Sequence, residues 1–398
     1  MAALIGYLRG PGRAVPVLAL TQIVGWGALI YSPVLILPQL GAERGWSLSF
    51  CMAGFSLALV TSGLLAPRLC SLIEGHGGHR VMAPGALAGA AGFVGLSLAA
   101  HPVAYFACWL LIGAAMSTTL YDAAFTSLGR IFGANARRQI IFVTFAGGFA
   151  STVGWPAEHF LLETVGWRST YLVLAAVLAL VVAPLHAFAL PRTVAAAPPK
   201  VSPHDSSAVT PPKISPAGAL FVLMAAGFAL HAFVLSGMIA NLLVMLERGG
   251  IDPTTVVIIG ALFGPSQVVA RLIDFAFANR TDPLRVARTA ILMMVAAFTL
   301  MTAAGISVPV AALFSILFGG ANGIVTIARG TLPLHIFGPV GYGLVLGRIA
   351  RPAALLQAFA PFVFATAIDI LPARAVFGFG LACVLVSLAC FLAIRKPG

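Results

Sequence analysis

The chain has 398 residues, of which 60% are hydrophobic and 9% are charged, and its mean hydropathy is +1.02. Soluble domains carry about 25% charged residues, so this composition excludes an ordinary soluble protein and predicts one that folds in a lipid bilayer. The net charge of +12 does not indicate a nucleic-acid partner, because the basic residues are spread along the chain rather than clustered on one soluble face.

Long apolar runs recur from one end of the chain to the other. Crossing a hydrocarbon core of about 30 Å takes roughly 20 helical residues. The runs cover residues 15–40, 47–70, 80–100, 103–130, 138–163, 167–190, 217–246, 253–276, 285–306, 308–331, 343–368 and 373–394. They are continuous and lack the alternation with period two of a barrel strand. The sequence therefore predicts an all-α integral membrane protein with twelve transmembrane helices.

The positions of Lys and Arg predict the orientation, because cytoplasmic loops carry the excess of these residues. With the N-terminus inside, 19 of the 23 basic residues lie at or toward the cytoplasm. The four left outside are Arg44, Arg168, Arg248 and Arg374. An even number of spans returns the C-terminus to the cytoplasm, so we expect a multi-pass protein of the cell membrane with both termini inside.

The two halves of the sequence share features at a nearly constant offset. Glu-Arg-Gly occurs at Glu43 and again at Glu247, each time at the end of the first apolar run of its half. Arg68 corresponds in the same way to Arg271, and Ile-Phe-Gly at residues 131–133 recurs at residues 336–338. The offsets of 203 to 205 residues predict a parallel duplication about an axis along the membrane normal.

Domain organisation follows from this repeat. Residues 1–190 and 217–398 are each expected to form a six-helix bundle. Residues 191–216, PRTVAAAPPKVSPHDSSAVTPPKISP, are rich in proline and poor in large apolar residues, which is typical of a linker. A small regulatory domain is the alternative for this segment.

The stretch between the second and third runs, GLLAPRLCSLIEGHGGHRV at residues 63–81, resembles the Gly-x-x-x-Asp-Arg-x-Gly-Arg-Arg loop of the major facilitator superfamily of secondary transporters. Glu74 takes the acidic position and Arg80 lies at the basic end, although Gly75 and Gly78 replace the usual arginines. Two six-helix halves joined by a linker are similar to this family along the whole chain. The resemblance implies alternating-access transport and a gating role for Glu74 and Arg80.

The fifth run carries GGFASTVGWP at residues 147–156, which is similar to the glycine-rich stretch ending in Gly-Pro of the family's antiporters. GWRSTY at residues 166–171 resembles the Gly-Trp-Arg that often follows it. Glycines such as Gly154 allow close helix approach, and Pro156 is expected to bend the helix. Such glycines also occur in membrane helices of other functions.

Two ionisable residues inside predicted helices are functional candidates, because each costs roughly 3 kcal/mol to insert. Asp122 lies in the fourth helix and Arg329 in the tenth, at nearly equivalent repeat positions. We expect them to form a pair across the inner mouth of a central cavity, and protonation of Asp122 would then couple a proton to opening. Alternatively, Asp122 caps backbone groups or pairs within its own half, and Arg329 extends to the cytoplasmic interface.

Arg271, in SQVVARLIDF of the eighth helix, resembles the arginine that carboxylate-transporting family members use to hold an anion. A guanidinium suits a carboxylate because it donates two parallel hydrogen bonds. Asp274 lies three residues further on the same helical face, so a neutralising pair is the alternative.

Other polar residues within the apolar runs are candidates for lining the cavity, because buried polar groups in a bilayer need partners. They are Gln22, Trp26, Tyr31, Ser32, His231, Ser236, Asn241, Gln267 and Asn322. Helix packing is the alternative for each of them. His231 lies in the middle of a helix and its residue type titrates near neutral pH, but a satisfied structural histidine is the competing interpretation.

The sequence contains no GxxxxGK[ST] loop, no HExxH and no other metal-ligand spacing. We therefore expect a transporter without a cofactor or metal, and not an enzyme. The favoured hypothesis is that a monomer transports a small organic anion together with protons. Proton-driven efflux of apolar compounds is the alternative, and a transporter-like sensor is the alternative that moves no substrate.

Overall fold

The computed structural model describes residues 10–192, 218–277 and 281–395. These residues form helices joined by short turns and contain no strand, which confirms the predicted all-α class. Residues 193–216 of the predicted linker lie outside the described residues. We call residues 10–192 the first half and the described residues from 218 onward the second half.

The first half begins with one long apolar stretch in three parts: α2 (Ala14–Trp26), the π-helical turn η2 (Gly27–Tyr31) and α3 (Ser32–Arg44). It continues with α4 (Leu48–His76), α5 (Gly78–Leu98), α6 (Pro102–Thr119), α7 (Tyr121–Phe132), α8 (Arg137–Gly147) and α9 (Ala150–Val177). Two π-helical segments, η4 (Leu178–Val182) and η5 (Leu185–Ala189), complete this half. Short 3-10 turns, η1 (Pro11–Arg13) and η3 (Gly133–Ala136), precede α2 and α8.

The second half contains seven described helices. They are α10 (Ala219–Arg248), α11 (Pro253–Ala261), α12 (Phe263–Phe277), α13 (Pro283–Ala304), α14 (Val308–Phe337), α15 (Tyr342–Ile370) and α16 (Ala373–Ala393). Helix starts follow ordinary capping chemistry, because Ser47 accepts a hydrogen bond from the backbone N–H of Phe50 at 3.2 Å and Asp252 from that of Thr255 at 3.0 Å.

Ten helical stretches of the described residues are long and apolar enough to cross a membrane. One of them runs from Pro102 to Ala189 and contains three of the predicted spans. Gly133 (φ 57°) and Gly166 (φ 76°) interrupt its helical path in the left-handed region that glycine tolerates best. The predicted count of twelve crossings and the cytoplasmic location of both termini stay predictions.

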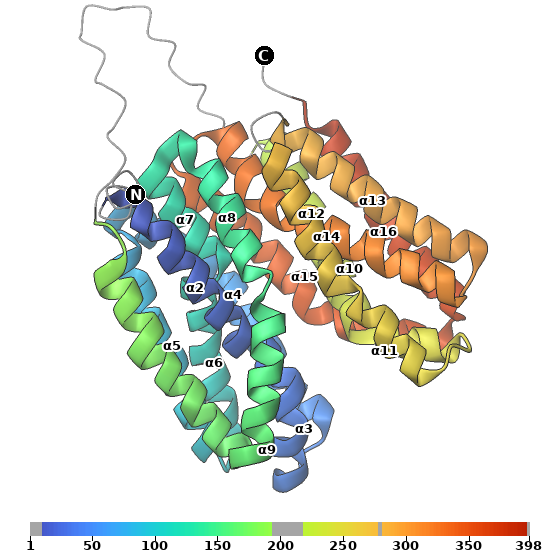
Figure 1. The fold of residues 1–398 in the computed structure, drawn as a ribbon, viewed down its shortest axis with the longest axis horizontal. Coiled ribbons are helices and arrows are strands. Elements are labelled where there is room, and N and C mark those ends of the chain that lie inside the picture. The colour runs from blue at the N-terminus through green and yellow to red at the C-terminus, as the bar shows by residue number, and fades with distance from the viewer. Residues whose placement is uncertain (1–9, 193–217, 278–280, 396–398) are drawn as a thin grey trace, which may run out of the picture.

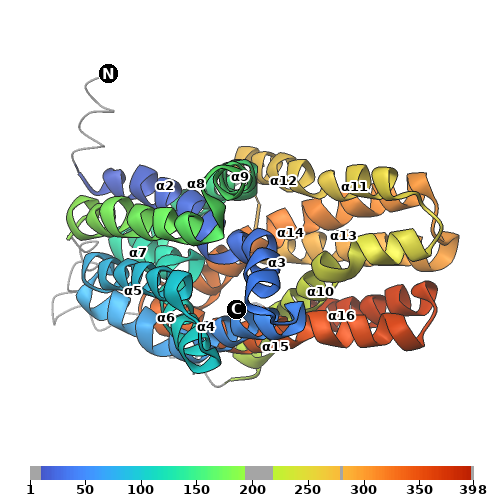
Figure 2. The ribbon, with the colours of Figure 1, turned by 90° about the horizontal axis from the view of Figure 1, so that it is seen from below.

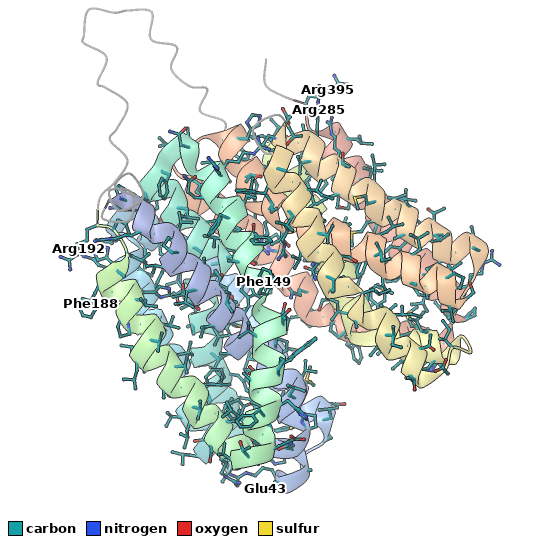
Figure 3. All side chains as sticks on the ribbon, in the orientation of Figure 1. Glu43, Phe149, Phe188, Arg192, Arg285 and Arg395 are labelled. Atoms are coloured by element: carbon teal, nitrogen blue, oxygen red, sulfur yellow. The ribbon has the colours of Figure 1, made fainter. Side chains whose placement is uncertain are left out.

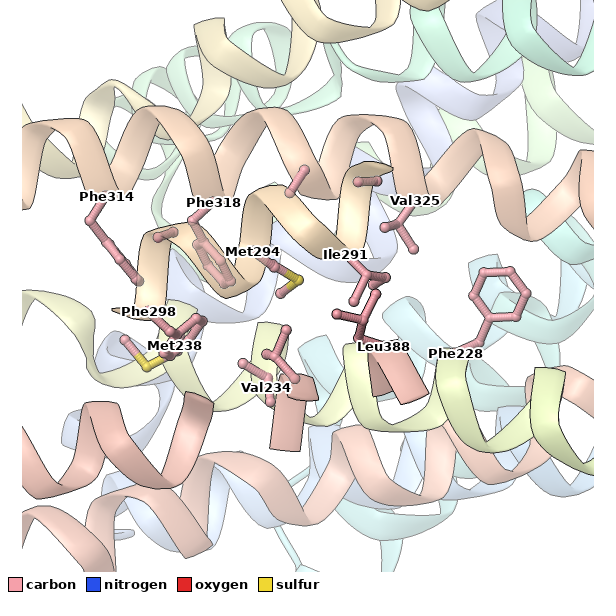
Figure 4. Packing of buried hydrophobic residues seen from close by; sticks show 14 of the residues in the cluster. Phe228, Val234, Met238, Ile291, Met294, Phe298, Phe314, Phe318, Val325 and Leu388 are labelled. Carbon is pink, nitrogen blue, oxygen red and sulfur yellow. The ribbon is translucent and has the colours of Figure 1, made fainter. Parts of the chain in front are cut away.

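The core of the second half is a cluster of aromatic, methionine and aliphatic side chains contributed chiefly by α10, α13, α14, α15 and α16 (Figure 4). The ring of Phe298 lies 5.3 Å from that of Phe314, which stacks on Phe318 at the same distance. Glycines bring α14 against α12, since a Cβ at Gly319 would lie 2.5 Å from the carbonyl oxygen of Phe263. This close approach, typical of membrane helices, fixes the position of α12 and of Arg271 on it.

The two halves lie side by side (Figures 1 and 2), and they approach each other at the end where α7 ends and α13 begins (Figure 1). Arg192, Arg285 and Arg395 lie at this end, whereas Glu43 lies at the opposite end (Figure 3). We call the first the inner end and the second the outer end. α15 connects the halves, because it packs against α10 and also against α4.

Candidate functional site

Asp122 and Arg329 form an ion pair between the halves, with Arg329 Nη2 2.7 Å from Asp122 Oδ2. Their side chains are 21% and 28% exposed, respectively. Asp122 lies in the first turn of α7, which starts anew after the extended residue Leu120, and a negative charge is favourable at a helix N-terminus. The side chain of Asp122 makes no capping hydrogen bond at the start of α7. The structure therefore shows Asp122 paired with Arg329 and not capping backbone groups.

The pair is not fully satisfied. Asp122 Oδ1 and Arg329 Nε are buried and have no hydrogen-bond partner among the described residues. His231 is 6% exposed, its Nε2 also lacks a partner in this part of the chain, and it interacts electrostatically with Arg329. Two buried polar atoms of the pair are therefore unpaired, and the partly exposed side chains are joined by one hydrogen bond.

Glu74 makes a second link between the halves at the inner end. Its Oε2 accepts a hydrogen bond from the backbone N–H of Gly343 at 3.1 Å, in the first turn of α15. Arg130 donates to the backbone carbonyl of Glu74, and Tyr342 donates to that of Gly330 at 2.7 Å. Arg80 is exposed, and its side chain makes no hydrogen bond or ion pair with the residues that the structure describes.

Arg271 is 4% exposed and lies where α12, α14 and α8 meet. Its Nη1 donates across the halves to the carbonyl of Thr144 at 3.0 Å, its Nε to the carbonyl of Gly323 at 3.3 Å, and its Nη2 to Gln267 Oε1 at 3.2 Å. Asn322 also donates to Gln267 Oε1, at 2.9 Å. The candidate residues Arg271, Gln267 and Asn322 thus form one network.

The alternative pair of Arg271 with Asp274 is wrong for this structure. No ion pair joins the two side chains among the described residues, and Asp274 Oδ2 is buried without a hydrogen-bond partner there. The two residues are three positions apart on one helix, but the guanidinium of Arg271 donates to the carbonyl of Thr144 in the other half. Arg271 is therefore held by neutral oxygens only, in the part of the chain that the structure describes.

Aromatic side chains of the first half lie beside Arg271. The Tyr121 hydroxyl donates to the carbonyl of Thr144, the same oxygen that Arg271 binds, at 3.3 Å. The ring of Trp26 lies 4.9 Å from that of Tyr121 and 6.5 Å from that of Tyr31, and Tyr31 lies 5.5 Å from Trp155. We call Trp26, Tyr31, Tyr121 and Trp155 the aromatic cluster.

Of these residues, sequence reasoning missed Tyr121, Thr144 and Trp155. The adjacency of Tyr121 to Asp122 was one available signal. Thr144 offered none, because its backbone carbonyl makes the contact and any residue supplies a carbonyl.

The glycine-rich stretch creates the room for this arrangement. A Cβ at Gly148 would collide with Nη1 of Arg271, and one at Gly147 would collide with the Tyr121 hydroxyl. The interruption between α8 and α9 falls here, whereas Pro156 lies exposed within α9 and helical geometry continues past it as far as Gly166. Gly154 packs closely on η2, because a Cβ at this position would lie only 3.0 Å from the Cα of Gly27. The glycines thus serve close approach, as predicted for Gly154.

Several other polar candidates satisfy backbone groups. Gln22 is fully buried and donates to the carbonyl of Thr119 at 2.7 Å, at the interruption between α6 and α7, and it accepts from Trp26 Nε1 at 3.2 Å. Ser236 and Asn241 donate to carbonyls of α15 in the same way. These contacts favour a structural role for all three.

The combined geometry is a buried guanidinium that donates only to neutral oxygens of the described residues. A guanidinium buried without a carboxylate partner in the described residues is an unusual and costly arrangement in a membrane protein. It becomes favourable when a carboxylate or similar anion accepts its hydrogen bonds.

The sequence matches the family model described as Major Facilitator Superfamily over residues 17–350. The chain belongs to the Major Facilitator Superfamily. This confirms the resemblance predicted from the sequence and identifies a multi-pass integral membrane protein, for which secondary transport of a small molecule is the supported activity.

Relatives of this Major Facilitator Superfamily chain include both a sequence match and solved structures. An uncharacterized 38 kDa protein in the 23S RNA operon of Thermoproteus tenax is 27% identical over 311 residues, which cover 78% of this chain and 76% of that protein. The crystal structure of the human organic anion transporter MFSD10 (TETRAN) has a TM-score of 0.72 at 18% identity, covering 96% and 99% of the two chains. The E. coli fucose:proton symporter FucP has a TM-score of 0.71 at 12% identity, with the same coverage. These two structures establish the fold.

Proposed function

We propose that this protein transports a small organic anion of the monocarboxylate type, coupled to protons. The observation that carries this proposal is the buried Arg271 guanidinium, which binds only neutral oxygens of Thr144, Gly323 and Gln267 among the described residues. A carboxylate offers two acceptor oxygens in the spacing of the guanidinium donors.

The site lies between the halves, which suits alternating access. Arg271, Gln267 and Asn322 come from the second half, and the aromatic cluster comes from the first. A substrate whose anionic end binds Arg271 and whose apolar end contacts Trp26 and Tyr31 would touch both halves. We further propose that residues 1–190 and 217–398 move as two bundles around it, linked by residues 191–216.

The Asp122–Arg329 pair is proposed as the proton-sensitive inner gate. Protonation of Asp122 removes its charge and weakens the 2.7 Å contact, so that the halves can separate at the inner end. The ionisable groups that interact electrostatically with the pair are Cys70 on α4, His231 on α10 and Tyr342 on α15, and Glu74 on α4 interacts with Cys70. In this scheme, one proton binds the carboxylate of Asp122, and the ion pair with Arg329 breaks.

The test is uptake of labelled monocarboxylates and dicarboxylates into proteoliposomes, with and without an imposed proton gradient. Arg271→Gln is expected to abolish gradient-driven uptake. Arg374→Gln is the matched control, because Arg374 lies exposed at the outer end and donates to the carbonyl of Thr302. Uptake by Arg271→Gln at the wild-type rate contradicts the proposed substrate site.

The aromatic cluster favours a second candidate, proton-driven efflux of apolar or amphipathic compounds. Trp155 is 45% exposed and its ring contacts Tyr31, so an apolar compound has a surface to bind. In the same liposomes, export of a lipophilic cation dye without any carboxylate uptake would support this candidate over the first.

A further inference from the structure

Glu158 is a buried acid in α9 that the gate and the anion site do not use. It is 2% exposed, although its neighbours Ala157 and His159 are exposed. Neither Oε1 nor Oε2 has a hydrogen-bond partner, and no Arg, Lys or His forms an ion pair with it in the described part of the chain. The side chain is therefore buried within the first half and has no cationic partner among the described residues.

The carboxyl group lies at the contact between α9 and the π-helical turn η2. Gly154, one turn before Glu158, faces Gly27 at the start of η2: a Cβ at Gly154 would lie 3.0 Å from the Gly27 Cα and 4.0 Å from Glu158 Oε1. π-helical turns occur frequently at functional sites. Because neither glycine carries a side chain, the backbones of α9 and η2 pack directly against each other here.

Another buried polar group without a hydrogen-bond partner lies near Glu158. Tyr171, on the second part of α9, interacts electrostatically with Glu158, and its hydroxyl is also buried without a hydrogen-bond partner among the described residues. The ionisable residues on the elements that pack against α9 are Tyr31 on η2, Glu43 and Arg44 at the outer end of α3, and His79 and Arg80 at the inner end of α5. Glu43 is engaged by Arg168 and Trp167.

An unpaired carboxylate in this setting is far less favourable than the neutral acid, because nothing replaces its hydration. Burial of the neutral acid costs much less free energy than burial of the carboxylate. In the state with the halves joined at the inner end, burial therefore favours the protonated form of Glu158.

We propose that Glu158 is a second proton-binding site, separate from Asp122. A proton from the outer water binds the carboxylate while the site is open, and the resulting neutral acid is buried at the α9–η2 contact. Movement of α9 relative to η2 admits water, and the acid releases the same proton. This inference rests on the proposed function only for its role in coupling, since proton binding itself needs no substrate.

Infrared spectroscopy of the purified protein tests this site without any substrate. At neutral pH, where exposed carboxylates are ionised, the wild type is expected to show carbonyl-stretch absorption from protonated carboxyl groups, and the component contributed by Glu158 is expected to be missing from Glu158→Gln. Glu163→Gln is the matched control, because Glu163 lies on the same helix but is exposed and pairs with His159. Circular dichroism and thermal unfolding establish that both variants fold.

Identical wild-type and Glu158→Gln spectra would overturn the inference. A second readout is proton flux into proteoliposomes, where Glu158→Gln is expected to reduce the proton movement per substrate by about half while Glu163→Gln leaves it unchanged. If the band depends on Glu158 but no carboxylate is transported, the proposed substrate is wrong and the proton site stands. If carboxylate transport and proton flux are normal in Glu158→Gln, the proton site is wrong and the proposed function stands.

Discussion

The inner and outer ends of the molecule use charged residues in opposite ways. At the inner end, polar and charged contacts cross between the halves: Asp122 with Arg329, Glu74 with Gly343, Arg137 with Thr281, and Arg271 with Thr144. At the outer end, the ion pairs stay within one half: Glu43 with Arg168 at 2.5 Å, and Arg248 with Asp369 at 3.1 Å. Between the residues that the structure describes, no hydrogen bond or ion pair joins the outer ends.

This difference separates contacts that hold one state from contacts that hold each half together. An ion pair within a half survives when the halves move, whereas one between the halves must break. The inner contacts are therefore the ones expected to respond to substrate and protons, and the outer pairs are expected to be indifferent to them. The repeated Glu-Arg-Gly marks the outer ends of α3 and α10, where each copy supplies one member of such a pair.

The largest effect is expected from Asp122→Asn, which removes the charge that faces Arg329. Loss of one partner of a partly buried pair costs about 2 kcal/mol, which is roughly a 30-fold shift toward the state open at the inner end. Spin labels placed at the inner ends of α7 and α14 measure the shift as a longer distance between the halves. An unchanged distance distribution would show that this pair does not close the inner end.

A smaller effect is expected from Gly148→Ala, because the new methyl group would meet the guanidinium of Arg271. Overpacking of this kind costs about 1–3 kcal/mol, so we expect roughly a tenfold weaker apparent affinity for the anion. Gly264→Ala on α12 is the control, since a Cβ there meets nothing within 4 Å. Equal anion affinities of the two variants would show that Gly148 does not contribute to the anion site.

The smallest effect is expected from Arg248→Gln at the outer end. The side chains of Arg248 and Asp369 are 51% and 68% exposed, and exposed pairs contribute at most about 1 kcal/mol. Thermal unfolding is expected to shift slightly and transport not at all. A strong transport defect in this variant would break the distinction between the two ends.

The sequence was informative wherever one local pattern decides the structure. Apolar runs predicted the helices, and the offset between the repeats predicted that Asp122 and Arg329 face each other. The interruption of the helix at Leu120 was missed, because its free backbone carbonyls are satisfied by side chains of neighbouring helices. Gln22, for example, donates to the carbonyl of Thr119. Sequence reasoning can propose ionisable residues inside a helix, but their partners depend on how the helices pack.

Arg271 and Glu158 illustrate that limit. Asp274 lies close to Arg271 in sequence, but the contact with Thr144 comes from the other half and from a backbone atom. Glu158 belongs to PAEHF near the end of its apolar run, where exposed His159 and Glu163 make an acidic residue look like part of the interface. Its burial is visible only once α9 is packed against η2.

The central claim is that an anion binds at Arg271, and thermal stabilisation of the purified protein tests it most directly. A ligand that binds the folded state stabilises it by about 2.7 kcal/mol at 100 times its Kd. Monocarboxylates are expected to raise the Tm of the wild type and of Arg374→Gln in a concentration-dependent way, and to leave that of Arg271→Gln unchanged. Equal stabilisation of Arg271→Gln would contradict the account.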